Sequence, residues 1–183
     1  MVDVATAQSE LRDSYLNGGP GTVVSGVVWL AAAVTSVRSG VAAGFAVLFL
    51  GGILIFPATL AIVRLVFHRP PPSRENPGGR TVVESIFPMM GCLLAAWLLI
   101  PSRPDAVFPL SAIGIGSHYF SFRTAYGDVT FWALGATLCL VGLGSIFAKM
   151  PGPAAVGFVV ASIEMVFGFL LTRTGLTSCA ATH

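Results

Sequence analysis

The chain has 183 residues, of which 55% are hydrophobic and only 10% are charged, whereas an ordinary soluble domain is about 25% charged. A soluble protein of this size cannot cover its surface with so few polar groups. Together with a mean hydropathy of +0.84, this composition excludes a soluble globule, a disordered chain and a disulfide-rich secreted module. It predicts an all-α integral membrane protein. The net charge of +2, without a dense basic run, argues against nucleic-acid binding.

The first 19 residues carry apolar side chains at helical spacing among polar ones, at Val4, Ala7, Leu11 and Tyr15. This pattern predicts a short amphipathic helix on the membrane surface over residues 1–19. The run Gly18-Gly19-Pro20-Gly21 then breaks the helix. Because the N-terminus is rich in acidic residues, it is not typical of a cleaved signal peptide, and we expect the first span to be retained.

Six apolar stretches have about the length that crosses 30 Å of hydrocarbon, which takes about 20 helical residues. They lie at about 20–37, 41–66, 82–100, 106–122, 129–148 and 153–172. We expect one transmembrane domain over 20–172, with Pro57 kinking the second span, followed by a cytoplasmic tail over 173–183. The fourth stretch is interrupted by Pro109, Gly114, Gly116 and His118. A re-entrant or interfacial segment there is the alternative, and a re-entrant one would leave five spans.

The distribution of basic residues predicts the orientation of the bundle. An inside N-terminus places seven basic residues inside and three outside. The inside residues are Arg12, Arg64, Arg69, Arg74, Arg80, Arg123 and Arg173, and the outside residues are Arg38, Arg103 and Lys149. Both termini are therefore expected on the cytoplasmic side. We expect the loop over 68–80 to be solvated, and contact with anionic lipid headgroups is the alternative.

Ionisable groups at membrane depth normally face the bundle interior, because exposing them to lipid costs about 2.5–3.5 kcal/mol each. Glu164 lies about 11 residues into the sixth span, roughly 16 Å along the helix. It shares a face with Gly157, Ala161 and Gly168, and small residues let a neighbouring helix approach closely. The sequence therefore predicts an inward-facing carboxyl near the midplane.

Further polar residues fall toward the predicted cytoplasmic ends of the spans. These candidates are Glu84, His118, Asp128, Arg64 and Arg123. Small residues share the helix faces of Glu84 and His118, as they do that of Glu164. We expect a polar cavity open to the cytoplasm, with Glu164 at its floor, which could relay protons, hold a metal or bind a charged ligand.

Each candidate also has a structural interpretation. Glu84 completes a Thr81-x-x-Glu84 capping box, and Asp128 stands at a helix start, where an acid favours the macrodipole. The two arginines could extend to the interface, His118 could be a packing residue, and Glu164 could be a protonated group bonding across helices. No catalytic or metal-binding motif is present, so the sequence specifies neither a cofactor nor a metal. Cys92, Cys139 and Cys179 read as small hydrophobic residues.

Three segments resemble a known family. They are Tyr15-Leu16-Asn17-Gly18-Gly19-Pro20-Gly21 with Ser25-Gly26 and Trp29, Gly79-Arg80 through Glu84-Ser85, and His118-Tyr119 through Tyr126-Gly127. The chain is similar over nearly its whole length to the DUF7010 family of small bacterial multi-pass membrane proteins of unknown function. The resemblance implies location in the bacterial inner (cytoplasmic) membrane. It implies no reaction, cofactor or ligand.

The leading functional hypothesis is a non-enzymatic, transporter-like or ligand-binding bundle. In it Glu164 holds a proton, a small cation or a lipid ligand, with Glu84 and His118 nearby. The alternative is an intramembrane enzyme acting on a lipid-like substrate, metal-assisted if Glu84, His118, Asp128 and Glu164 share one coordination sphere. A third reading is a structural or partner-binding subunit. The lipid bilayer is the expected partner, and the small-residue faces are compatible with a homo-oligomer.

Overall fold

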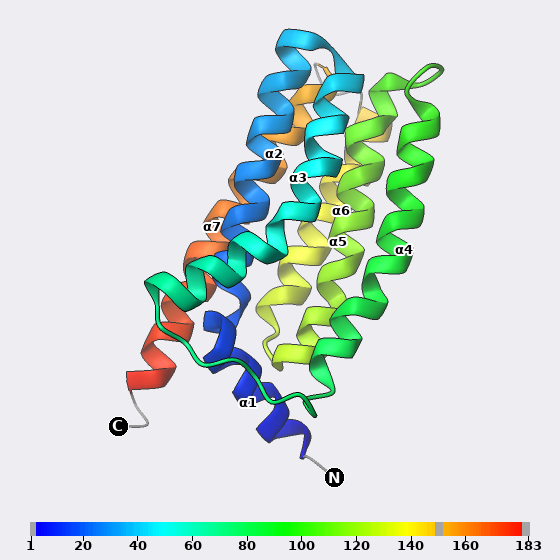
Figure 1. Ribbon diagram of the computed structural model, residues 1–183. Coiled ribbons are helices and arrows are strands. Elements are labelled where there is room, and N and C mark those ends of the chain that lie inside the picture. The colour runs from blue at the N-terminus through cyan, green and yellow to red at the C-terminus, as the bar shows by residue number, and fades with distance from the viewer. Residues whose placement is uncertain (1–2, 149–151, 181–183) are drawn as a thin grey trace.

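The protein is a bundle of long helices (Figure 1). The computed structural model describes residues 3–148 and 152–180, and within them no strand is present. The long helices are α2 (Gly19–Ser39), α3 (Val41–Ala61), α4 (Gly78–Leu99), α5 (Val107–Tyr126), α6 (Thr130–Ala148) and α7 (Pro153–Ala180). The shorter elements are α1 (Val4–Tyr15), the 3-10 turns Leu16–Gly18 and Pro104–Ala106, and the π-helical turn Ile62–Val66. The all-α membrane bundle predicted from the sequence is confirmed.

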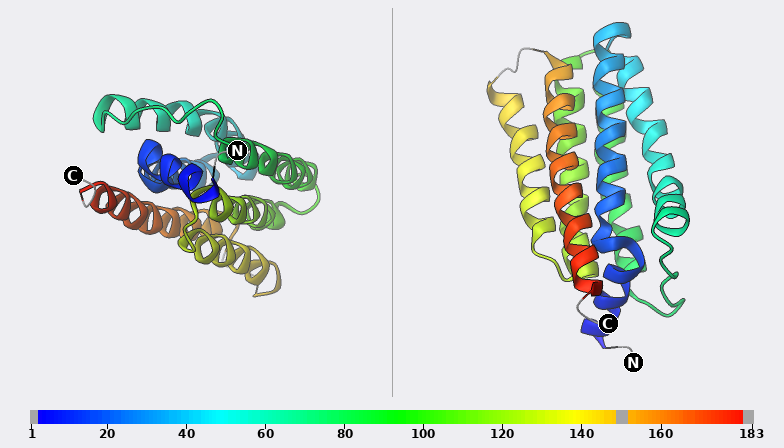
Figure 2. Two further views of the ribbon diagram at one scale, coloured as in Figure 1. Left: turned by 90° about the horizontal axis from the view of Figure 1, so that it is seen from below. Right: turned by 90° about the vertical axis from the view of Figure 1, so that its left-hand side faces the viewer.

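Within residues 3–148 and 152–180, five helical segments are long and apolar enough to cross a membrane, and α5 is not among them. α5 is nevertheless an unbroken helix of 20 residues that runs the length of the bundle between α4 and α6 (Figures 1 and 2). It does not turn back as the re-entrant alternative would require. Because neighbouring helices cover much of its surface, α5 tolerates Pro109, Ser111 and Gly116 at buried positions.

Glycines allow α2 and α7 to pack against each other more extensively than any other pair of helices. A Cβ atom on Gly168 would lie 2.7 Å from the backbone nitrogen of Val23 and 3.0 Å from the carbonyl oxygen of Gly19. A Cβ atom on Gly26 would lie 3.1 Å from the carbonyl oxygen of Ala161. The two backbones therefore approach closely, as in small-residue contacts between membrane helices.

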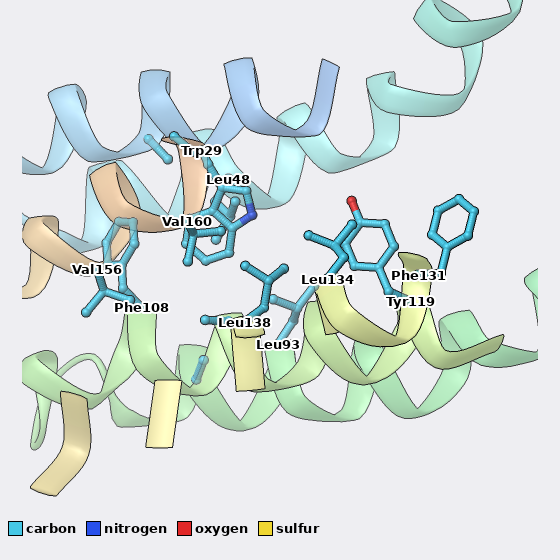
Figure 3. Packing of buried hydrophobic residues seen from close by; sticks show 14 of the residues in the cluster. Trp29, Leu48, Leu93, Phe108, Tyr119, Phe131, Leu134, Leu138, Val156 and Val160 are labelled. Carbon is cyan, nitrogen blue, oxygen red and sulfur yellow. The ribbon is translucent and has the colours of Figure 1, made fainter. Parts of the chain in front are cut away.

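Large apolar side chains fill the half of the bundle that lies farther from α1 (Figure 3). Trp29 of α2 packs against Phe108 of α5 with ring centroids 6.0 Å apart, and Val156 and Val160 of α7 are buried beside them. Toward the other end, Tyr119 stacks on Phe131 at 6.2 Å. The core is therefore continuous along the bundle.

The α1 helix lies beneath the end of the bundle where both chain ends are found (Figures 1 and 2). The Gln8 amide donates to the carbonyl of Thr124 at 2.9 Å, and Arg12 donates to the carbonyl of Tyr126 at 2.5 Å. Ala7 and Leu11 are buried. The apolar side expected to face lipid thus packs partly on the protein itself.

Three boundaries differ from the sequence prediction. α4 begins at Gly78 instead of residue 82, and α5 continues to Tyr126. α7 continues to Ala180, so residues 173–180 of the predicted tail extend the helix, and residues 181–183 lie outside the described part. As expected, α3 bends in the region of Pro57, where a backbone N–H is missing, before the π-helical turn (Figure 1).

Candidate functional site

Glu164 is completely buried where α2, α5 and α7 meet. The Tyr119 hydroxyl of α5 donates a hydrogen bond to Oε1 of Glu164 at 3.0 Å. The Ser25 hydroxyl of α2 lies close to both groups. Oε2 of Glu164 has no hydrogen-bond partner among the described residues. The carboxyl predicted to face inward is therefore held by a hydroxyl and retains an acceptor atom in the core.

No cation accompanies this carboxyl in the part of the chain that the structure describes. An ion pair joins Arg103 to Asp105 at 3.0 Å, but both of these side chains are exposed, and Glu164 takes part in no ion pair among the described residues. The Glu164 environment therefore consists of hydroxyl and apolar groups.

His118 precedes Tyr119 on α5 but faces a different helix. Its Nδ1 lies 2.7 Å from Oγ of Ser85 on α4, and its ring forms a T-shaped pair with Phe122, with ring centroids 4.8 Å apart. Successive helical residues point about 100° apart, so Tyr119 turns toward α7 while His118 turns toward α4. His118 therefore joins α5 to α4 through its contact with Ser85.

Glu84 lies on the outer surface of α4. Glu84, Pro88, Gly91 and Ala95 are all exposed, whereas the adjacent Ser85 is buried. The prediction that this small-residue face turns inward is wrong, because α4 packs on α5 through the opposite side. The capping-box interpretation is also wrong, since α4 begins at Gly78, six residues before Glu84.

Asp128 lies in the turn between α5 and α6 and joins three parts of the chain. Its Oδ1 accepts the backbone N–H of Thr130 at 2.8 Å, which supports the helix-start interpretation. Its Oδ2 accepts the Asn17 amide at 2.5 Å, and the same amide donates to Oγ1 of Thr174 at 3.3 Å. Burial raises the pKa of Asp128, but the hydrogen bonds from Asn17 and Thr130 outweigh that effect and the pKa is lowered.

The two arginine candidates stabilise the same end of the bundle. Arg64 donates to the carbonyls of Ser14, Arg69 and Pro70 at 3.3, 2.5 and 2.6 Å. Its guanidinium also lies 5.6 Å from the ring centroid of Tyr15. The exposed Arg123 lies over the Trp132 ring at 5.6 Å. Neither arginine reaches the carboxyl of Glu164 in a recorded ion pair.

The six candidates do not share one cavity. Surface hollows of about 300 Å³ beside α4 and about 560 Å³ between α1 and Pro70–Pro71 are not lined by Glu164. Within the described ranges, no three His, Cys, Asp or Glu side chains gather as metal ligands. The shared coordination sphere that the metal-assisted alternative requires is therefore not formed.

Sequence reasoning missed the residues that surround Glu164 and Asp128. Tyr119 and Ser25 appeared only within the family-like segments, and Asn17 only as part of the Gly-rich break. Asn17 has a left-handed backbone with a φ of 53° and a buried side chain. An asparagine before Gly18-Gly19 is a recognisable signal for such a turn, but nothing in the local pattern shows that its amide binds Asp128.

Comparison with known proteins places the chain in a family. Searches among curated proteins and among solved structures found no match. A family described as "Family of unknown function (DUF7010)" matches residues 4–174, which is nearly the whole chain. The chain therefore belongs to the DUF7010 family of proteins of unknown function.

Proposed function

We propose that this membrane protein is a transporter-like bundle in which Glu164 binds and releases a proton. The observation that carries the proposal is the complete burial of Glu164 between α2, α5 and α7, with no cationic partner in the described ranges. A buried ionised carboxylate that lacks a cation is very costly. The neutral acid therefore avoids the cost of a buried charge.

The neighbouring hydroxyls suit both protonation states of Glu164. When Glu164 is ionised, Tyr119 donates to Oε1, as it does in the structure. When Glu164 is protonated, its carboxyl becomes a donor, and the nearby Ser25 hydroxyl can accept because a hydroxyl both donates and accepts. This arrangement supports reversible proton binding.

A proton fits this site better than a metal ion does. Hard cations such as Ca²⁺ take six to eight oxygen ligands, several of them carboxylates. Around Glu164 the described neighbours add the hydroxyls of Tyr119 and Ser25 and no second carboxylate. The proposal therefore gives Glu164 the role of a single proton site.

The test measures proton flux in liposomes that contain the purified protein and a pH-sensitive dye. We expect the Glu164→Gln variant to reduce protein-dependent flux by at least tenfold, because glutamine cannot ionise. Glu84→Gln is the matched control, since it removes an exposed carboxyl from the outer surface of α4 and should leave the flux unchanged.

Equal flux in wild type and Glu164→Gln would contradict the proposal. In that case the Glu164–Tyr119 hydrogen bond, which joins α7 to α5, would have a structural role. Such a role predicts a lower unfolding temperature for Glu164→Gln and no change in flux.

A further inference from the structure

Buried polar groups are distributed unevenly on the two sides of Glu164. We infer that protons reach Glu164 from the α1 end of the bundle, along a polar column formed by Asp128, Asn17, Thr22 and Ser25. The inference rests on the proposed function and adds the route by which the proton moves.

Three members of the polar column lie in the Leu16–Gly18 turn and the first turns of α2. Asn17, Thr22 and Ser25 are 2%, 2% and 5% exposed. Thr22 and Ser25 are three residues apart, so they share a helix face, and both lie close to the Tyr119 hydroxyl. That hydroxyl donates to Glu164 at 3.0 Å. The inner end of the column is therefore in contact with the proton site.

The outer end of the column is Asp128, which is only partly buried. The Asn17 amide donates to Asp128 at 2.5 Å, while the buried Oδ1 of Asn17 has no hydrogen-bond partner among the described residues. Asn17 therefore binds the partly exposed carboxylate through its amide N–H, and its Oδ1, in the turn that leads into α2, is the atom that can accept a proton.

The α1 helix holds the turn that carries Asp128 and so determines how Asp128 is exposed to solvent. Arg12 and Gln8 of α1 donate to the carbonyls of Tyr126 and Thr124, just before the turn that carries Asp128. Arg12 is also the cation whose charge acts on Asp128. Access to the column thus lies at the edge of α1.

On the other side of Glu164 the described core is mainly apolar, and its buried polar side chains are the isolated Ser111 and Ser36. Trp29, Phe108, Val156 and Val160 are at most 1% exposed and fill that region (Figure 3). The indole N–H of Trp29 donates only and cannot accept a proton. The Ser111 hydroxyl there donates to the carbonyl of Val107 at 2.8 Å. Thr22 likewise donates to a nearby backbone carbonyl, that of Gly18, at 3.2 Å, but Thr22 also lies close to the Tyr119 hydroxyl. The polar column is therefore one-sided.

The test follows how fast the Glu164 carboxylic acid exchanges its proton for deuterium. Infrared spectra of the full chain in lipid are recorded after transfer to D2O, and the band of Glu164 is identified by its loss in Glu164→Gln. We expect Thr22→Val, which keeps the side-chain shape but removes the hydroxyl, to slow the exchange at least tenfold. Asp128→Asn, which removes the carboxylate at the outer end, should have the same effect.

The matched controls are Thr22→Ser, which retains the hydroxyl, and Ser111→Ala, which deletes a hydroxyl on the apolar side of Glu164. In both variants the Glu164 proton should exchange at the wild-type rate. Exchange rates are compared only between variants whose unfolding temperatures are equal. Wild-type exchange in Thr22→Val or in Asp128→Asn would overturn the inferred route, as would equally slow exchange in Ser111→Ala. These outcomes leave the proposed function intact if Glu164→Gln still abolishes proton flux, whereas unchanged flux in Glu164→Gln contradicts the proposed function itself.

Discussion

At the scale of single residues, two glutamates in this bundle have opposite surroundings. Glu164 is completely buried and bound by Tyr119, whereas Glu84 is exposed on the outer surface of α4. Both share a helix face with small residues. The rotation of each helix about its own axis decides which face meets a neighbour, and it gives the two carboxyls different chemistry.

The glycines also differ in their surroundings, because some lie against a neighbouring helix and others face open space. This difference predicts how their substitution affects stability. Gly168→Ala should destabilise the protein by about 1–3 kcal/mol, the usual range for overpacking, because its Cβ would meet the backbone of α2 at 2.7 Å. Thermal unfolding in detergent measures the effect. Gly91→Ala is the control, since nothing lies within 4 Å of a Cβ there, and it should be neutral or slightly stabilising. Equal destabilisation by both variants would show that the α2–α7 contact is looser than described.

At the scale of elements, hydrogen bonds to two carboxylates hold the α1 end of the bundle together. Glu10 accepts the Asn76 amide at 2.6 Å and the backbone N–H of Ser73 at 2.5 Å, which ties the loop before α4 to α1. These bonds lower the pKa of Glu10. Asp128, whose pKa is also lowered, binds Asn17 directly after α1.

This arrangement predicts that acid loosens α1. A carboxyl whose pKa is lowered in the folded state stabilises that state at pH values above its ordinary pKa, and the stabilisation is lost as the pH falls through the lowered value. The ordinary values are 4.5 for Glu10 and 3.8 for Asp128, so the docking of α1 should be constant near neutral pH and weaken below them. Amide hydrogen exchange over residues 4–15 measures the docking.

Replacing both acids tests the cause of this acid effect. In the variant Glu10→Gln with Asp128→Asn, protection of residues 4–15 should be weaker at neutral pH and nearly independent of pH through the acid range. A variant that still loses protection with the wild-type pH profile would show that other groups govern the docking of α1.

At the scale of the whole molecule, both described chain ends lie at one end of the bundle, beside α1 (Figure 1). Because α2 to α7 alternate in direction, the fold places both termini on the same side of the membrane if all six helices cross it. We propose that this side is the cytoplasmic side of the inner membrane, as the excess of arginines indicates.

The sidedness is tested with single cysteines introduced near each terminus and at Ser102 in the α4–α5 turn, in a chain whose three native cysteines are replaced. In intact cells an impermeant thiol reagent should label only the cysteine at position 102. Labelling of both termini would contradict the predicted orientation, and labelling of one terminus alone would show that an odd number of helices crosses the membrane.

The sequence by itself determined the membrane class, the approximate positions of the helices and the inward direction of Glu164. These follow from local quantities, because length and hydropathy define a span and small residues around one carboxyl define a packed face. Five described segments are apolar enough to be recognised as spans, but α5 is not. Other helices shield much of α5 from lipid, so it can contain more polar residues. Its weak pattern reflects its position in the bundle.

Only the tertiary structure decided which residues meet. In a lipid-embedded bundle most helices are apolar on every side, so the pattern of one helix does not show which face packs. For this reason the outward rotation of Glu84 could not be predicted. The bond between Asn17 and Asp128 joins residues 111 positions apart, and the pairing of Tyr119 with Glu164 joins α5 to α7. Such contacts depend on how separate helices pack, and no local spacing contains that information.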